Sequence, residues 1–459
     1  MSVDLVVIGA GPAGMAAATL ASELGLATLL VDEQEAPGGQ IYRGVEHAGD
    51  ASPLGADYLA GRELTEALRH SKADYRPATT VWHIDPDGMV SLARSGGSDT
   101  VAARRVLLAT GAIERPVPIP GWTLPGVMTA GAAQIMLKSA DLVPDGPAVL
   151  AGQGPLLYLV ALQLARAGAP PVAVLETTPA GNRLAALGQL GLWWEGRRDL
   201  RKGLSWMLGV RRAGIAVRRN VRGLRAVGRE RLERVVWDGG EMAADHLFLH
   251  EGVIPTTQIS LGLRLAHEWD AAQLCWRPVT DRWGRTSLAN IAIAGDGGGI
   301  AGAAAAASSG RLAALDAAAL LGLFDDDERD RRAAPIRAQR YRESALRPLL
   351  DALYRPGPAV LCPDDDVVIC RCEEVTAGQL RRAVRLGAQG PNQAKAFLRC
   401  GMGPCQGRIC GPIVSAVIAD ERQAPIAEIG TYRPRAPYKP ITLGTLAGIG
   451  NAPASEIDS

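Results

Sequence analysis

The sequence of 459 residues predicts an α/β fold in which one dinucleotide-binding unit is inserted into another, followed by a small cysteine-rich domain. Three observations lead to this fold class. A G-x-G-x-x-G motif follows an apolar strand at residues 9–14, and a related motif follows a second apolar strand at residues 152–157. Five of the seven cysteines fall between residues 370 and 410. At roughly 150 residues per domain, the length suits three such units.

The composition is that of an ordinary globular chain, with 47% hydrophobic and 21% charged residues. A net charge of +1 gives no support for nucleic-acid binding. We expect no transmembrane segment, because every long apolar stretch is interrupted by charge, and Asp4 stands where a secretory signal would be positive. The expected location is cytoplasmic, with any membrane association made through a complex. In that reducing compartment, clustered cysteines favour metal or redox roles over disulfides.

The first glycine motif lies in DLVVIGAGPAG, between an apolar strand and a helix that leads to a second strand, LATLLV. Gly9 permits the tight turn, Gly11 lets a pyrophosphate approach the helix N-terminus, and Gly14 allows close packing of helix on strand. Asp32 and Glu33 follow the second strand at the spacing where an acid binds ribose hydroxyls, and the count from Gly14 slightly favours Asp32. An acid here also selects against a 2′-phosphate, and therefore against NADP.

Three later stretches carry a resemblance, namely PGGQIYR (37–43), VLLATGAIERPVPIPG (106–121) and IAIAGDGGGIAGAAAAASSGRLAA (291–314). With the first motif they resemble the two-dinucleotide-domain flavoproteins, which include thioredoxin reductase and glutathione reductase. The resemblance implies that an A-T-G strand end and a G-D pair hold a flavin nucleotide, which favours FAD over NAD at the first site. The positions that it implies are Gly39, Gln40, Thr110, Gly111, Gly295 and Asp296.

The second glycine motif begins with Gly152 and Gly154 but has Leu157 in place of the third glycine, and the strand VAVLE that follows ends at Glu176. The flavoproteins just named insert an NAD domain at this point. A large side chain at Leu157 is expected to push the helix from the strand and to crowd a phosphate. Two interpretations stay open: a site for NAD or another adenine nucleotide, or a Rossmann-like fold kept for architecture.

The sequence offers no candidate catalytic residue. Disulfide reductases of this superfamily carry C-x-x-C beside the flavin, whereas the stretch after the A-T-G strand, GVMTAGAAQIML, contains no cysteine. Neither H-E-x-x-H nor a paired carboxylate motif occurs, and the six histidines are scattered. A substrate base is therefore not expected in this chain.

The C-terminal cysteines comprise a C-x-C pair, Cys370 and Cys372, and a second group, Cys400, Cys405 and Cys410, with two C-x4-C gaps. Iron–sulfur clusters take four thiolate ligands, whereas structural zinc more commonly uses C-x2–4-C knuckles. A [2Fe–2S] cluster is therefore favoured over zinc or a role of free thiols. Spacing alone leaves the three cysteines of the second group as equal candidates.

A second resemblance orders these cysteines. CRCEEVTAGQLRRAV and RCGMGPCQGRIC together resemble the bacterioferritin-associated-ferredoxin-like [2Fe–2S] domain. The resemblance implies four metal ligands and leaves Cys400 outside the pattern, so Cys400→Ser is expected to keep the cluster and Cys405→Ser to lose it. The implied ligands are Cys370, Cys372, Cys405 and Cys410.

Over nearly its whole length, the sequence resembles the α (A) subunits of bacterial heteromeric amino-acid and opine dehydrogenases, among them opine oxidase, hydroxyproline and proline dehydrogenase and hydrogen cyanide synthase. The resemblance implies an electron-transfer subunit, with a separate oxidase-like flavoprotein β subunit oxidising a C–N bond. In relatives, a small third subunit with its own [2Fe–2S] cluster or an FMN at the α/β contact takes part, and electrons pass to a quinone or other acceptor. Some relatives hold NAD or ATP where this fold would hold FAD.

Two alternatives come from other function classes. One is a self-sufficient NADH-dependent flavin reductase, or diaphorase, against which Leu157 argues. The other is a scaffold whose nucleotides are purely structural. Redox-active flavin and its response to NADH distinguish the three functions.

The motifs and a change of composition near residue 362 also predict the domain boundaries. The FAD-binding domain is expected to be discontinuous, because the inserted unit interrupts it. The expected ranges are 1–120 and 285–330 for the FAD-binding domain, 121–284 for the inserted NAD-type domain, 331–361 for a linker, 362–422 for the [2Fe–2S] domain and 423–459 for an extended C-terminal tail.

Overall fold

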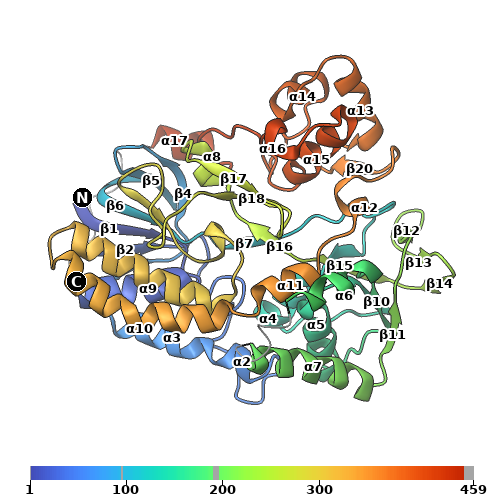
Figure 1. Cartoon of the computed structure of the whole chain (residues 1–459), viewed down its shortest axis with the longest axis horizontal. Helices are drawn as coiled ribbons and strands as arrows, with labels where there is room; N and C mark the ends of the chain where they lie inside the picture. The colour runs from blue at the N-terminus through green and yellow to red at the C-terminus, as the bar shows by residue number, and fades with distance from the viewer. Residues whose placement is uncertain (1, 95–96, 190–195, 449–459) are drawn as a thin grey trace.

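The computed structural model describes residues 2–94, 97–189 and 196–448. Two mainly parallel sheets with flanking helices form the larger part of the described chain, and a helical C-terminal unit lies on one side of them (Figure 1). The predicted α/β class with two Rossmann-like sheets is confirmed. No helix in these described ranges is both long and apolar enough to cross a membrane.

The first sheet is assembled from two separate stretches of chain. β1 (Ser2–Ile8) runs parallel to β2 (Thr28–Val31) and β6 (Gly97–Leu108), with Val6 opposite Leu29 on one side and Val106 on the other. β19 (Ile291–Ile293) returns from much later in the sequence and pairs with β6 in parallel. The strand order is β3 (Asp74–Arg76), β2 (Thr28–Val31), β1 (Ser2–Ile8), β6 (Gly97–Leu108), β5 (Met89–Arg94) and β4 (Thr80–Ile84).

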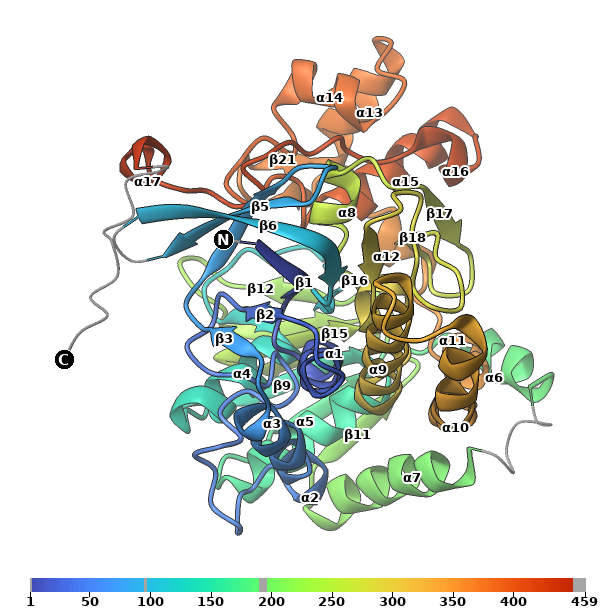
Figure 2. The same ribbon diagram turned by 90° about the vertical axis from the view of Figure 1, so that its left-hand side faces the viewer.

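Two alanine-rich helices, α1 (Pro12–Glu23) and α9 (Ala303–Leu320), pack on this sheet and on each other (Figure 2). Their close approach depends on small residues, because a Cβ at Gly310 would lie 2.0 Å from the Ala13 carbonyl oxygen. α2 (Ala56–Leu59) and α3 (Gly61–His70) follow β2 along the chain. The range 331–361 is largely helical, since it contains most of α10 (Asp326–Ser344), together with α11 (Arg347–Leu353) and α12 (Pro358–Leu361).

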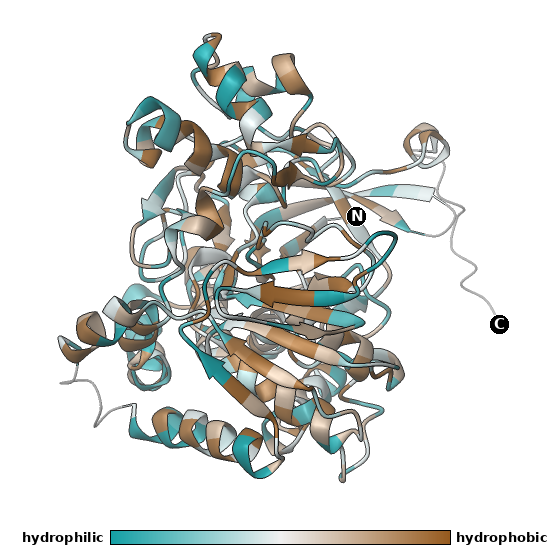
Figure 3. Cartoon of the chain, turned by 90° about the vertical axis from the view of Figure 1, so that its right-hand side faces the viewer, coloured by the Kyte–Doolittle hydropathy of each residue, from teal (hydrophilic) through white to brown (hydrophobic). Residues whose placement is uncertain are grey.

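The second sheet lies between the two stretches of the first in sequence, and its strands are parallel. Apolar residues concentrate on its central strands (Figure 3), because helices pack on one face of this sheet and the antiparallel strands within residues 225–243 pack on the other. Its strand order is β11 (Ala216–Arg219), β10 (Ala173–Glu176), β9 (Ala148–Gln153), β15 (His246–Glu251) and β8 (Val127–Thr129). Its helices are α4 (Ala130–Ala140), α5 (Pro155–Arg166), α6 (Ala180–Leu187) and α7 (Arg197–Arg212).

Smaller antiparallel elements complete the nucleotide-binding body. The ribbon of β7 (Ala112–Glu114) and β16 (Val253–Pro255) connects the two sheets. The others are β12 (Arg225–Val227), β13 (Arg234–Trp237), β14 (Gly240–Ala243), β17 (His267–Asp270) and β18 (Cys275–Pro278), with the short helices α8 (Gln258–Gly262) and η2 (Gly295–Gly298).

The C-terminal unit has its own apolar core, which includes Ile369, Leu380, Ile413 and Val417. Trp122 attaches it to the body by donating its indole N–H to the Val368 carbonyl at 2.7 Å. The chain then returns, and α17 (Leu443–Ala447) lies beside β6 of the first sheet (Figure 2). The unit contains β20 (Val368–Cys370), β21 (Val375–Thr376), α13 (Ala377–Arg385), α14 (Pro391–Leu398), α15 (Gly411–Arg422) and α16 (Ile426–Ile429).

Candidate nucleotide and metal sites

The first glycine motif forms a tight turn between β1 and α1. Gly9 has φ +104°, and a Cβ at Gly14 would lie 1.8 Å from the Gly9 carbonyl oxygen, so neither position accepts a larger residue. Gly11 precedes α1 and has no side chain to cap its first N–H groups. These N–H groups and the helix dipole therefore provide an anion site where a pyrophosphate would lie.

The two predicted acids at the end of β2 have different surroundings. Asp32 is buried and accepts the Ala10 N–H at 2.5 Å on one oxygen and the Gln34 N–H at 2.7 Å on the other. Its carboxylate therefore holds the glycine turn in place. Glu33 is exposed and forms an ion pair with Lys439, which comes from the C-terminal segment.

The predicted A-T-G and G-D segments lie side by side in the structure. A Cβ at Gly297 would lie 3.5 Å from both the Gly111 carbonyl oxygen and the Thr110 hydroxyl oxygen. The Gly295 N–H donates to the Ser309 hydroxyl at 2.7 Å, and one Asp296 oxygen accepts the N–H groups of residues 301 and 302 at 2.8 and 3.0 Å. The distant halves of the first unit thus meet at one edge of the sheet.

The PGGQIYR loop passes close to the first glycine turn. A Cβ at Gly39 would lie 2.9 Å from the Gly11 Cα. Lys138 donates to the Gln40 carbonyl at 3.0 Å and to the Gln134 side chain at 2.9 Å. Burial lowers the pKa of Lys138 to about 7. The glycine turn, the PGGQIYR loop and the A-T-G and G-D segments therefore approach one another closely at one end of the first sheet.

The second glycine motif adopts a similar turn but differs at the helix. Gly152 has φ +136°, and a Cβ there would lie 1.8 Å from the His250 carbonyl oxygen. Gly154 precedes α5 with φ +99°. Leu157 is 0% exposed and belongs to the same core cluster as Leu150. Its side chain fills the interior beside the sheet, where the third glycine would leave room for close packing.

The acid of the second motif is already engaged by the protein. Glu176 is buried, accepts the Tyr158 hydroxyl at 2.9 Å and lies 3.4 Å from the Arg219 guanidinium. Both contacts involve the same carboxylate oxygen, Oε2. Glu176 is therefore buried with two side-chain partners, a tyrosine and an arginine, with which a ribose would compete, whereas Glu33 is exposed and has Lys439 as its ion-pair partner.

The five clustered cysteines occupy one region around β20 and the start of α15. The sulfur atoms of Cys370, Cys400 and Cys410 lie within 4.8 Å of one another, and all three residues are buried. Cys372 and Cys405 form a second pair through a hydrogen bond between their side chains. The four ligands implied by the sequence therefore form two pairs, and Cys400, which the pattern left outside, joins the buried pair.

Hydrogen bonds favour one thiolate in this group. Donation from Cys400 and Cys410, together with the Gly401 and Glu373 N–H groups, lowers the pKa of Cys370 to about 2. The hydrogen bond with Cys370 raises the pKa of Cys410 well above its usual range. A cluster of thiols with backbone N–H donors around it fits a thiolate-ligated metal centre.

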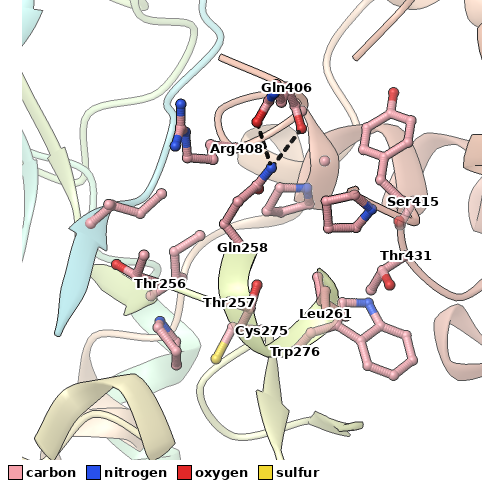
Figure 4. Close-up of a pocket in the computed structure, with 18 residues that line it drawn as sticks. Thr256, Thr257, Gln258, Leu261, Cys275, Trp276, Gln406, Arg408, Ser415 and Thr431 are labelled. Carbon is pink, nitrogen blue, oxygen red and sulfur yellow. Dashed lines mark hydrogen bonds between the residues drawn. The ribbon is translucent and has the colours of Figure 1, made fainter. Parts of the chain in front are cut away.

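A pocket separates the cysteine domain from residues 254–276, and Leu263 and Leu265 in this stretch belong to the core of the first nucleotide unit (Figure 4). It lies between residues 254–261 and 275–276 on one side and residues 406–415 and 431–434 on the other. Across its edge, the Gln258 amide donates to the carbonyl and side-chain oxygens of Gln406 at 3.4 and 3.3 Å. Thr256, which follows β16 and lies two residues before Gln258, is also hydrogen-bonded to the first site, because its N–H donates to the Gly111 carbonyl at 3.0 Å.

Comparisons with known proteins agree with this arrangement. Residues 3–183 match the family of pyridine nucleotide-disulphide oxidoreductases, and residues 367–449 match the sarcosine oxidase A3 domain. L-proline dehydrogenase from P. horikoshii has the same fold, with a TM-score of 0.70 and 21% identity over 97% of this chain and 79% of that one. Fold and site together define a protein that has the pyridine nucleotide-disulphide oxidoreductase fold with an added C-terminal cysteine domain.

More similar relatives define the family. The A subunit of opine oxidase from Rhizobium meliloti (strain 1021) is 45% identical over 97% of this chain and 98% of its own length. Hydrogen cyanide synthase subunit HcnB from Pseudomonas protegens is 34% identical over 96% of this chain and 97% of its own. The chain belongs to the family of opine oxidase A subunits, and this confirms the resemblance drawn from the sequence. Together with the pyridine nucleotide-disulphide oxidoreductase domain, this membership supports an FAD-dependent oxidoreductase that acts as one subunit of a complex.

Proposed function

We propose that this chain is the electron-transfer subunit of a heteromeric dehydrogenase that oxidises an amino acid or an opine at its C–N bond. A separate oxidase-like flavoprotein β subunit carries out that oxidation and delivers the electrons. The opine oxidase and hydrogen cyanide synthase relatives are each one subunit of an enzyme by name, and they cover nearly all of this chain. The absence of a predicted substrate base from this sequence agrees with such a division of labour.

The observation that carries the proposal is the contact between Gln258 and Gln406. Gln258 lies two residues after Thr256, whose N–H donates to the Gly111 carbonyl at the first site, and Gln406 is the neighbour of Cys405. A short chain of covalent and hydrogen bonds thus joins the first nucleotide site to the cysteine centre. Such a connection suits electron transfer between a flavin and an iron–sulfur cluster.

The first site would hold FAD through Gly9, Gly11, Gly14, Asp32, Glu33, Gly39, Gln40, Thr110, Gly111, Gly295 and Asp296. NAD or ATP, which some relatives hold in this fold, is the competing occupant. Cys370, Cys372, Cys405 and Cys410 would hold the [2Fe–2S] cluster. A bound flavin would accept two electrons together and release them one at a time, and the cluster would take each of them singly, so together they would match a two-electron donor to a one-electron acceptor.

Other components of the complex follow from the same proposal. An FMN at the contact with the β subunit, or a small third [2Fe–2S] subunit, would connect the two flavoproteins, and a quinone or another acceptor would take the electrons. NAD or another adenine nucleotide at Gly152, Gly154 and Glu176 has less support, because Tyr158 and Arg219 already engage Glu176.

The test is to purify the chain alone and together with an oxidase-like partner from a neighbouring reading frame. Alone, it is expected to contain FAD, iron and sulfide in stoichiometric amounts and to be inactive on amino acids and opines. With the partner, substrate should reduce its flavin and cluster. Substrate oxidation by the isolated chain would overturn the proposal, and rapid flavin bleaching by NADH would favour a diaphorase instead. A chain without redox-active flavin would indicate the scaffold.

A further inference from the structure

The C-terminal segment brings a lysine to the first nucleotide site. Lys439 forms an ion pair with Glu33 at the end of β2. Burial lowers the pKa of Lys439, and the Asp32 carboxylate lies close enough to offset part of that effect. Asp32 and Glu33 are the two acids placed at the adenosine ribose by the glycine motif. Residues 33 and 439 are far apart in sequence, so the motif alone does not predict this contact.

The position of Lys439 is fixed by its neighbour. Tyr438 is 3% exposed, its N–H donates to the Trp82 carbonyl at 2.8 Å, and its hydroxyl donates to the Ile84 carbonyl at 3.4 Å. Both acceptors belong to β4 of the first sheet. A buried tyrosine thus anchors the segment, and the following lysine side chain has a defined place rather than a free surface position.

The same segment is attached to the cysteine loop. Gln406 donates its side-chain amide to the Pro437 carbonyl at 3.0 Å, and Arg408 donates to the Tyr438 carbonyl at 3.3 Å. Gln406 and Arg408 lie between Cys405 and Cys410 in sequence. Residues 437–439 therefore connect the loop that carries two predicted metal ligands with the acid pair of the first site.

We propose that Lys439 is a nucleotide-binding and specificity-determining residue of the first site, which contacts the adenosine half of the bound nucleotide. The inference rests on the proposed function in one respect only, because it requires a nucleotide with an adenosine group at the first site. FAD, NAD and ATP all contain that group. An ammonium group has three donors, and the Glu33 carboxylate takes part of this capacity. The remaining donors are available to ribose oxygens.

The pairing also explains discrimination at the ribose 2′ position. Asp32 and Glu33 together carry two negative charges, and Lys439 offsets one of them, so the ribose end keeps a net negative charge that disfavours a 2′-phosphate. Replacing Glu33 by glutamine leaves Asp32 and Lys439 balanced and releases the ammonium group. Glu33→Gln is therefore expected to admit a 2′-phosphate, whereas Lys439→Gln is expected to weaken adenosine binding.

The experiment titrates the full chain, freed of nucleotide, with AMP and with 2′,5′-ADP by calorimetry. Lys439→Gln should weaken AMP binding at least fivefold, whereas Lys439→Arg should bind AMP with most of the wild-type affinity. Glu33→Gln should lower the ratio of AMP to 2′,5′-ADP affinity at least tenfold. Lys202→Gln removes a lysine that is ion-paired with Asp57, away from the first site, and it is the matched control that should change neither affinity.

The outcomes separate this inference from the proposed function. If the wild type binds AMP but Lys439→Gln binds it equally well and Glu33→Gln keeps the same ratio, Lys439 only stabilises the fold and the inference is wrong. If the wild type binds neither AMP nor FAD, the first nucleotide site itself is wrong and the proposed function fails with it. Iron content and the unfolding temperature of each variant show whether the cysteine domain and the fold are intact.

Discussion

The side-chain amide of Gln258 lies 3.3 Å from the side-chain oxygen of Gln406, and this contact joins the first nucleotide unit to the cysteine domain. Gln258 is the first residue of α8, and Gln406 lies in the loop before α15. Gln406 also donates to the Pro437 carbonyl, so one side chain connects three parts of the chain. The packing of the cysteine domain on the body therefore includes polar contacts that single substitutions can remove.

We expect Gln258→Ala to slow electron transfer between a flavin at the first site and the cysteine centre several-fold. Loss of the hydrogen bond also costs about 1 kcal/mol of docking free energy. Rapid-mixing absorbance with a reductant that reduces the flavin measures the rate at which the cluster is reduced. Gln339→Ala is the control, because Gln339 makes its hydrogen bond to Glu343 on the exposed face of α10. Equal rates in both variants would show that this contact has no part in the transfer.

Leu157→Gly restores the G-x-G-x-x-G spacing of the second motif but is not expected to create a nucleotide site. Leu157 is completely buried, and removal of such a side chain costs about 2–5 kcal/mol. Glu176 would still be held by Tyr158 and Arg219. We therefore expect a lower unfolding temperature and unchanged NADH affinity.

Calorimetry of unfolding and NADH titration test the two parts of this prediction separately. Leu156→Gly is the matched control, because it places glycine in the same helix turn at a partly buried position. The control should lose less stability than Leu157→Gly. A gain of NADH binding in Leu157→Gly alone would show that the leucine is what closes the second site.

The buried Lys138 is expected to make the stability of the folded chain increase with pH above neutrality. Burial lowers its pKa from 10.5 to about 7 in the folded chain, so between these values the unfolded state binds more protons than the folded state. The free energy of unfolding therefore rises with pH across this window, by up to about 1.4 kcal/mol per pH unit. Below the window Lys138 is charged in the folded state, and the full cost of burying that charge lowers the stability. Lys138→Met removes the titrating group.

The measurement is the unfolding temperature of both proteins as the pH increases from about 7 toward 10.5. The difference between wild type and Lys138→Met should shift in favour of the wild type as the pH rises. Lys202→Met replaces a more exposed lysine and should run parallel to the wild type. Parallel curves for Lys138→Met would mean that Lys138 keeps its ordinary pKa.

The fold class and the first glycine turn were predictable because local sequence determines them. Gly9 and Gly14 are required by backbone contacts within a few residues or with the adjacent strand, and a buried parallel strand is recognisable as an apolar run. The partners of Gly111 were accessible only through a family resemblance, since the G-D segment returns from the distant end of the discontinuous unit. The contact of Glu33 with Lys439 left no signal in the sequence, because Lys439 is placed by the burial of Tyr438 against β4.

At the cysteine centre, too, the sequence did not predict a placement that depends on a tertiary contact. The C-x-C pair and the second group indicated a metal site, but spacing gave no reason to place Cys400 beside Cys370 and Cys410. Cys400 is buried just after Arg399, the C-cap residue of α14, and there Tyr432 donates its hydroxyl to the Cys400 carbonyl at 2.9 Å. Tyr432 comes from the C-terminal segment, so this placement depends on a tertiary contact.

Two serine variants test which four of the five cysteines hold the cluster. Cys405 is the hydrogen-bonding neighbour of Cys372, so Cys405→Ser would leave the more exposed pair with one thiolate, and we expect loss of the cluster. Cys400 lies beside Cys370 and Cys410, which still form a pair when it is replaced, so Cys400→Ser should keep the cluster. Iron and sulfide analysis with visible absorption gives the result, and the control is Cys275→Ser, which replaces a buried cysteine outside the group of five. Equal iron loss in both variants would contradict the assignment, and loss in Cys400→Ser alone would make Cys400 the fourth ligand.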